Sequence, residues 1–145
     1  MTDPRALYHA TIIDHDRHPR HEGVLAGATH AATVDNPLCG DVVTIHLVID
    51  GPTVVAASFE ARGCAVSRAA ASIATTRAIG ARPDDLRALA TAFDRFVHAP
   101  VDAPPPAELG ELEAFGGVRA VKSRRSCACL AFRALTAALG ATLSP

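Results

Sequence analysis

The segment from residue 42 to residue 61 constrains the fold most, because it contains two strand-like patterns joined by a turn signal. One face of the first pattern carries Val43, Ile45, Leu47 and Ile49. Such alternation is typical of a β-strand with one buried face. The second pattern, from residue 54 to 61, places Val55, Ala57 and Phe59 on one face. Because the intervening Asp50-Gly51 favours a tight turn, we expect an antiparallel hairpin.

Most of the remaining chain shows helical patterns. Helices are expected over residues 4–17, 65–79, 83–98 and from about 127 to 139, with a short helical turn at 107–115. Pro4, with Asp3 as a possible cap, and Pro83 suit the first turn of a helix. Gly80 and Gly140 suit helix ends. The sequence therefore predicts helices that follow the hairpin and one that precedes it.

The segments between these elements are predicted to be irregular. Residues 23–34 read as a loop leading into an edge strand, and residues 99–106, with four of the ten prolines, read as a surface linker. Gly116-Gly117 should end the helical turn, and residues 118–126 should form a basic loop. The whole pattern predicts one α+β domain over residues 1–145. Its core would be a small antiparallel sheet of about three strands with helices packed on one face.

Charge and hydropathy exclude two classes of partner. The chain has 14 Lys and Arg residues against 15 Asp and Glu residues, whereas a nucleic-acid-binding protein usually carries a basic stripe. The sequence also lacks an apolar run typical of a membrane span or a signal peptide. We therefore expect a cytoplasmic protein that binds neither nucleic acid nor membrane. In that compartment cysteines more often bind metals or react than form disulfides.

Four histidines lie between residues 15 and 30, at His15, His18, His21 and His30. None lies near a cysteine in the sequence. A solvated helix end, where imidazole groups interact with the helix dipole, is the simpler interpretation of the run from residue 15 to 21. We therefore do not predict a histidine metal site.

The segment from Asp35 to Asp41 carries the first candidate functional groups. Asn36-Pro37 favours a turn. Gly40 gives the backbone the freedom to bring the Cys39 thiol and the Asp41 carboxylate together. Cys64 follows the second strand of the hairpin, so antiparallel pairing should bring it to the same sheet edge. A thiol and a carboxylate that converge are a plausible half of a zinc site.

The remaining cysteines, Cys127 and Cys129, lie near the predicted start of the last helix. They are about 200° apart around the helix axis, so only one can face a given site. Cys64 and Cys127, each expected at a helix start, should have a thiol pKa lowered by the helix dipole. Cys129 is predicted to be an inert, packed thiol.

Three cysteine motifs then reveal a family resemblance that covers nearly the whole chain. Residues 35–41 (Asp-Asn-Pro-Leu-Cys-Gly-Asp), 63–67 (Gly-Cys-Ala-Val-Ser) and 124–132 (Arg-x-x-Cys-Ala-x-Leu-Ala-Phe) resemble the SufU branch of the IscU-like iron–sulfur assembly family. The order and spacing of the motifs are those of the family. Ser126 stands where the IscU branch has histidine, and residues 99–115 resemble an insertion that marks the SufU branch. Val121-Lys122 and His15-Asp16 depart from the family pattern, which leaves the partner surface open.

The resemblance implies a ligand set, a cofactor and partners. The implied ligands of one zinc ion are Cys39, Asp41, Cys64 and Cys127, and Arg124 is an implied supporting residue. Implied partners are a SufS-like, pyridoxal-phosphate-dependent cysteine desulfurase and a downstream complex that builds iron–sulfur clusters. The implied activity is that of a zinc-dependent sulfurtransferase, in which Cys39 accepts persulfide sulfur.

Two other functions stay open at this point. The same ligands could hold an iron–sulfur cluster on a scaffold protein, an interpretation that Ser126 disfavours. The zinc could also be purely structural, although structural sites usually use only cysteine and histidine.

Overall fold

The computed structural model describes residues 9–143. Three strands form an antiparallel sheet in the order β1-β2-β3: β1 is His30–Asn36, β2 is Asp41–Asp50 and β3 is Thr53–Arg62. The predicted α+β class with a three-stranded sheet is confirmed. The edge strand begins at His30, inside the segment that we predicted to be a loop.

The hairpin forms where the sequence predicts it, with one difference in register. Val43, Ile45 and Leu47 are fully buried, as expected. In β3, however, Val54 is fully buried whereas Val55 is 49% exposed, so the prediction that Val55 shares one face with Ala57 and Phe59 is wrong. The register shifts between Val48 and Ile49, which indicates a β-bulge. A bulge reverses the faces of the residues that follow it, and the alternation of apolar residues alone does not reveal it.

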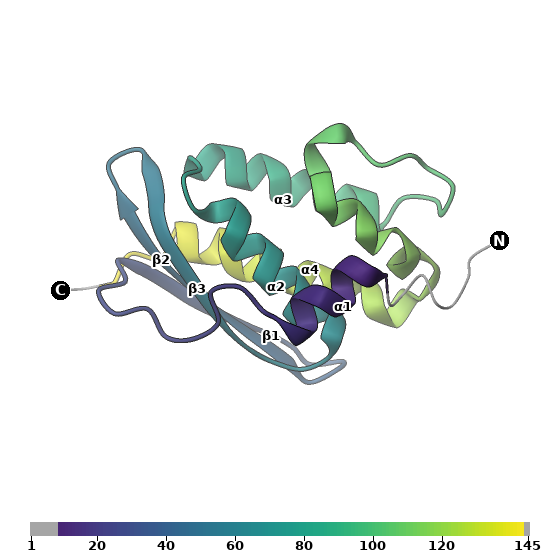
Figure 1. Cartoon of the computed structure of the whole chain (residues 1–145), viewed down its shortest axis with the longest axis horizontal. Helices are drawn as coiled ribbons and strands as arrows, with labels where there is room; N and C mark the ends of the chain where they lie inside the picture. The colour runs from purple at the N-terminus through teal and green to yellow at the C-terminus, as the bar shows by residue number, and fades with distance from the viewer. Residues whose placement is uncertain (1–8, 144–145) are drawn as a thin grey trace.

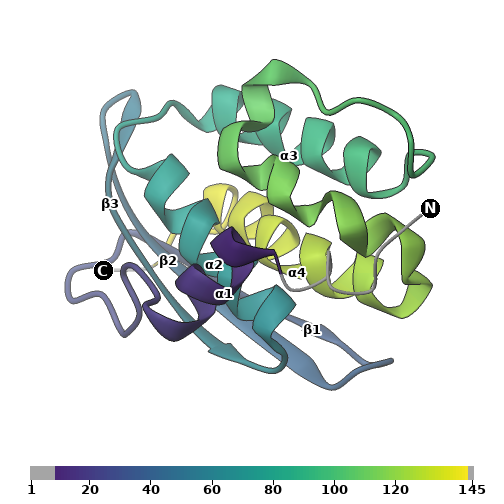
Figure 2. The same ribbon diagram turned by 45° about the vertical axis from the view of Figure 1, so that its right-hand side comes forward.

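Helices cover one face of the sheet, as Figures 1 and 2 show. They are α1 (Ala10–Arg17), α2 (Ala65–Ala78), α3 (Pro83–Val97), the 3₁₀ segment η2 (Ala107–Ala120) and α4 (Lys122–Leu139). Helix α4 packs on β1 and β2, and α2 packs on β3. Helix α3 and η2 form an outer layer against α4. The alanine-rich α2 buries most of its length, because small side chains allow close approach of its neighbours.

The C-terminal third of the chain is more helical than the sequence suggested. The segment η2 continues through Gly116-Gly117 to Ala120, and its only non-helical residue is Gly110. Helix α4 begins at Lys122, so Cys127 is the sixth residue of the helix and the predicted start is wrong. The predicted basic loop is therefore largely helical. Arg119 is buried and donates hydrogen bonds to the carbonyls of Pro100 and Ala103.

The histidine run also differs from its prediction. His15 is 3% exposed, and its Nδ1 lies 2.7 Å from Ser72 Oγ. The solvated-end interpretation is therefore wrong for His15, because α1 packs on α2. The helix is observed from Ala10 to Arg17, and the predicted first turn at Asp3 and Pro4 lies outside the described residues.

Candidate metal centre

Cys39 lies in the turn that joins β1 to β2. The carbonyl of Asn36 accepts hydrogen bonds from the backbone N–H groups of Cys39 (3.2 Å) and Gly40 (2.8 Å). Gly40 has φ of +75°, a conformation that other residues rarely adopt. The neighbouring Leu38 is 90% exposed, and Cys39 is also exposed. The turn therefore presents the Cys39 thiol to solvent.

The same turn is tied to helix α4. The Asn36 amide Nδ2 donates to Ser126 Oγ at 2.9 Å, and its Oδ1 accepts from the N–H of Leu38 at 3.1 Å. Asn36 is buried. It therefore links the chain around Cys39 to the turn of α4 that precedes Cys127.

Asp41, the first residue of β2, is buried beneath this turn, and its carboxylate accepts hydrogen bonds from two side chains. Ser67 Oγ donates to its Oδ2 at 2.5 Å, and Cys64 Sγ donates to the same oxygen at 3.3 Å. Burial by itself raises the pKa of the Asp41 carboxyl, but hydrogen bonds from Ser67 and the cysteines outweigh it, so the pKa is lowered. Asp41 is therefore held as an oriented carboxylate.

Gly63 makes room for that carboxylate. Its φ is +153°, and a Cβ at this position would collide with the side chain of Asp41. The next residue, Cys64, is half-buried and is the N-cap of α2. Glycine at position 63 thus lets the end of β3 approach Asp41 closely while it delivers Cys64 to the start of the helix.

Cys127 reaches the same place from the interior of α4. It is fully buried, and its Sγ lies 3.4 Å from Cys39 Sγ and 3.6 Å from the carbonyl of Ser123. Burial raises the pKa of the Cys127 thiol, and the neighbouring Cys39 and Cys64 raise it further. The predicted lowering of this pKa is therefore wrong, because Cys127 lies more than a turn inside the helix and is desolvated.

The structure brings the four predicted ligands together. The donor atoms of Cys39, Asp41 and Cys127 all lie within 4.8 Å of one another, and Cys64 adjoins them through its contact with Asp41. A tetrahedral zinc site has sulfur–sulfur edges of about 3.8 Å and sulfur–oxygen edges of about 3.5 Å. The observed 3.4 Å between Cys39 and Cys127 and 3.3 Å between Cys64 and Asp41 are close to these edges. Three thiols and a carboxylate in this arrangement fit a zinc ion.

Arg124 lies on the first turn of α4, beside the cysteines. Its pKa is raised, chiefly by Coulombic attraction to Cys64 and then by contact with Cys127. Its positive charge thus lies where it can offset the charge of thiolates. The supporting role that the sequence suggested for Arg124 stays a prediction.

Sequence reasoning missed two polar contacts of the site. The first is Ser67, which is fully buried and orients Asp41. Its position three residues after the N-cap Cys64, where a side chain points back toward a helix start, was an available signal. The second is the contact between Asn36 and Ser126, which no local pattern reveals because 90 positions separate the two residues.

A second polar cluster has the composition of a hydrolytic triad, but its serine is buried and a substrate cannot reach it. His15 lies between Ser72 Oγ (2.7 Å) and Glu111 Oε1 (3.3 Å). Ser72 is fully buried in the middle of α2, and its Oγ also accepts from the N–H of Arg20 at 2.9 Å. A nucleophile needs a path to its substrate, and Ser72 lacks one. We therefore interpret this cluster as a structural contact that joins α1, α2 and η2.

Cys129 faces away from the metal centre, as the helix geometry predicts. It is 2% exposed, and burial raises the pKa of its thiol to about 12, with a further contribution from the Asp94 carboxylate. It lines a pocket between α3 and α4.

Among residues 9–143, no helix has both the length and the apolar character needed to cross a lipid bilayer.

The fold and the site define a small α+β protein with a thiol-rich candidate metal centre at one end of a three-stranded sheet. Residues 7–128 match the NifU-like N-terminal domain family, and the chain belongs to this family. It is 35% identical to the iron–sulfur cluster assembly scaffold protein IscU of Streptococcus pyogenes serotype M1, over 92% of this chain and 82% of that protein. It is 33% identical to the zinc-dependent sulfurtransferase SufU of Bacillus subtilis (strain 168), over 89% of this chain and 86% of that protein.

A solved structure agrees with this assignment. The N-terminal part of a nitrogen-fixing NifU-like protein from Brucella abortus superimposes with a TM-score of 0.85 and 28% identity. The match covers 94% of each chain. The resemblance to the IscU and SufU family noted in the sequence is confirmed, and the chain is a member of this iron–sulfur cluster assembly family.

Proposed function

We propose that this protein is a zinc-dependent sulfur acceptor in the cytoplasm. It takes persulfide sulfur from a pyridoxal-phosphate-dependent cysteine desulfurase and passes it to a complex that builds iron–sulfur clusters. The similarity to a protein named zinc-dependent sulfurtransferase supports this proposal. The similarity to a protein named IscU scaffold supports the broader setting of cluster assembly.

The observation that carries the proposal is the contrast in exposure within the site. Cys39 is exposed on a turn, whereas Asp41 and Cys127 are buried and Cys64 is half-buried. A sulfur acceptor needs one thiol that can meet a partner's persulfide while the remaining groups stay in place. This arrangement supports Cys39 as the acceptor and the other three residues as anchors.

Cys39, Asp41, Cys64 and Cys127 would hold the zinc ion. When bound, zinc would lower the pKa values of the coordinating thiols and keep them as thiolates. Ser67 orients the Asp41 carboxylate through its hydrogen bond, as outer-shell groups do in metal sites. Arg124 adds positive charge beside Cys64 and Cys127.

The transfer step is a thiol exchange on sulfur. The Cys39 thiolate attacks the terminal sulfur of the partner's persulfide, a new sulfur–sulfur bond forms on Cys39, and the partner's sulfur–sulfur bond breaks. The partner leaves as a thiolate, so no oxidant or reductant is consumed. The exposure of Cys39 on the turn at residues 37–40 supports this step.

A scaffold that assembles a cluster on the same ligands is the alternative. Ser126 precedes Cys127, and its hydroxyl accepts a hydrogen bond from Asn36. A serine at this position provides no imidazole ligand to the site. This contact favours the sulfur acceptor over the scaffold.

The test combines metal analysis with persulfide labelling. Protein purified without added metal is expected to contain zinc at this site, with Cys39, Cys64 and Cys127 shielded from thiol reagents until chelation. After mixing with a cysteine desulfurase and cysteine, mass spectrometry should find persulfide on Cys39. Bound iron with visible absorbance after anaerobic reconstitution, without persulfide on Cys39, would establish the scaffold instead. Retained zinc with neither signal would leave a structural site and overturn the proposal.

A further inference from the structure

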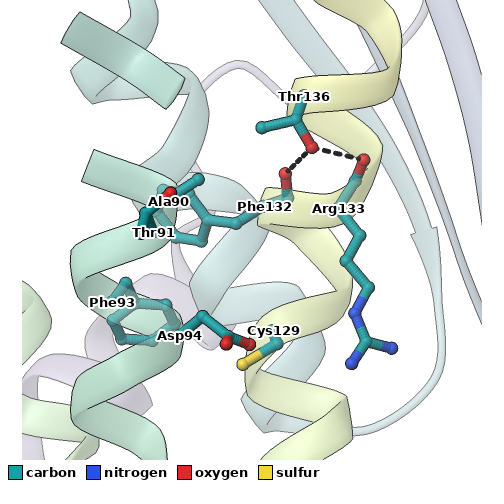
Figure 3. A pocket seen from close by; sticks show the side chains of 8 residues that line it. All are labelled: Ala90, Thr91, Phe93, Asp94, Cys129, Phe132, Arg133 and Thr136. Atoms are coloured by element: carbon teal, nitrogen blue, oxygen red, sulfur yellow. Dashed lines mark hydrogen bonds between the residues drawn. The ribbon is translucent and has the colours of Figure 1, made fainter. Parts of the chain in front are cut away.

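The pocket between α3 and α4 contains polar groups that sulfur transfer does not use. Its volume is about 240 Å³, and Cys129 lies in its wall. Figure 3 shows the Asp94 carboxylate and the Cys129 thiol pointing toward one another from the two helices. Cys129 is 2% exposed, so a polar thiol is held in the pocket wall with little contact with bulk water.

A third donor lies beside these two. His98 follows the last turn of α3, four residues after Asp94, so the two side chains share one face of the helix. Its Nδ1 lies 3.7 Å from Asp94 Oδ1 and 2.9 Å from the Asp94 carbonyl. One donor atom from each of Asp94, His98 and Cys129 lies within 4.8 Å of the other two.

We propose that Asp94, His98 and Cys129 form a second cation site, selective for a thiophilic divalent cation such as zinc. Carboxylate, imidazole and thiolate are the three donor types that zinc takes in proteins. Three protein ligands with a water molecule in the fourth position complete a tetrahedron. Magnesium and calcium prefer oxygen ligands, so this donor set selects against them.

The charges at the site fit a divalent cation. Binding replaces the proton of the Cys129 thiol, which passes to solvent, and leaves the carboxylate and the thiolate to balance the two positive charges. The donors come from two helices that pack on each other, so a bound ion would join α3 to α4. Asp94 and His98 are exposed, which gives the ion a path from solvent.

The second site lies close to the first. His98 also lines a pocket beside Cys39, together with Ser123 and Ser126 of α4. Cys127 and Cys129 are two residues apart on that helix. An ion held by Cys129 would therefore stabilise the helix that carries a ligand of the first site, without sharing a ligand with it.

Zinc stoichiometry tests the proposal. The metal-free, reduced protein is equilibrated at pH 8 with a small excess of zinc, freed of unbound metal by gel filtration and analysed for zinc per chain. Two zinc ions are expected for the wild type, and one for each of the variants His98→Ala, Asp94→Asn and Cys129→Ala. Cobalt(II) supplies an optical readout, because the second equivalent should add thiolate-to-cobalt absorbance that Cys129→Ala lacks.

The control variants distinguish loss of zinc at this site from loss of zinc at the first site and from a general loss of folding. Asp84→Asn makes the same charge change on α3 at a fully exposed carboxylate, and it should retain two zinc ions. His98 is exposed, so His98→Ala tests the site without disturbing the core. Cys39→Ser should weaken only the first site. One zinc in the wild type with no change in the α3–α4 variants, or two zinc ions in all of them, would overturn the proposal.

Discussion

Cys127 and Cys129 are two residues apart on α4, yet their surroundings differ in kind. Cys127 faces the end of the sheet, where its partners come from a turn, a strand start and a helix start. Cys129 faces α3, where its polar neighbours Asp94 and His98 belong to one helical face. Both thiols are buried. The comparison teaches that the element opposite a buried thiol decides which groups the thiol meets: a turn brings an exposed second thiol to Cys127, whereas a helix brings an exposed carboxylate and imidazole to Cys129.

The largest effect is expected from Cys39, the exposed thiol of the first site. Cys39→Ser should reduce persulfide capture to background, because no other thiol at the site is exposed. Mass spectrometry after mixing with a desulfurase measures this directly. Thr33→Ala, on β1 at an exposed threonine pair, should leave capture unchanged. Persulfide on Cys127 or Cys64 at a normal rate in Cys39→Ser would contradict the comparison.

Alkylation of the metal-free protein should rank the thiols by exposure. In a reducing buffer with a chelator, Cys39 is expected to react first, and Cys127 and Cys129 only when the structure opens. If their protection is limited by global unfolding, the difference in rate is at least about 10³-fold. Peptide mapping after timed alkylation checks the order. Cys129 reacting as fast as Cys39 would show that the helix opposite it does not restrict access.

Substitutions of Gly63 and Gly40, the two glycines near Asp41, distinguish the cost of backbone strain from the cost of a steric collision. Gly63→Ala should cost about 3 kcal/mol or more and lower zinc affinity, because its Cβ meets Asp41 and its φ is unfavourable. Gly40→Ala is the matched control: its φ is also positive, but a Cβ there meets nothing within 4 Å, so about 1–2 kcal/mol is expected. Urea unfolding and zinc titration measure both. Equal losses would mean that the approach of Gly63 to Asp41 does not matter.

The smallest effects concern the contact that ties the Cys39 turn to α4. Asn36→Ala removes two side-chain hydrogen bonds and should cost about 1–3 kcal/mol, whereas Ser126→Ala removes one and should cost about 0.5–1.5 kcal/mol. The unfolding free energies of the metal-free single and double variants give the coupling energy between Asn36 and Ser126. If the two losses simply add, the contact does not hold the turn.

Much of the first site follows from the sequence for a local reason. Cys39 and Asp41 flank a turn glycine, and Cys64 comes directly after the strand that pairs with β2. Antiparallel pairing brings such positions together whatever the rest of the fold does. Cys127 does not share this property, and its place in the ligand set was implied by family resemblance.

The errors arose where packing overrides local pattern. Gly116-Gly117 and the basic run after it suggested irregular chain, but these residues belong to η2 and α4, which pack against α3 and each other. His15 looked like part of a solvated helix end, yet α2 supplies Ser72 as its buried partner. Propensity is a weak predictor when a neighbouring element provides the contacts.

The sequence by itself determined the hairpin, the α+β class and the convergence of Cys39, Asp41 and Cys64, because period-two alternation and turn residues act over short distances. Only the tertiary structure decided that Cys127 is buried inside α4, that Ser67 and Gly63 shape the Asp41 carboxylate, and that Cys129 meets Asp94 and His98. These features depend on how helices and strands far apart in the sequence pack together. Such packing is set by the sum of many weak contacts and leaves no short pattern in the chain.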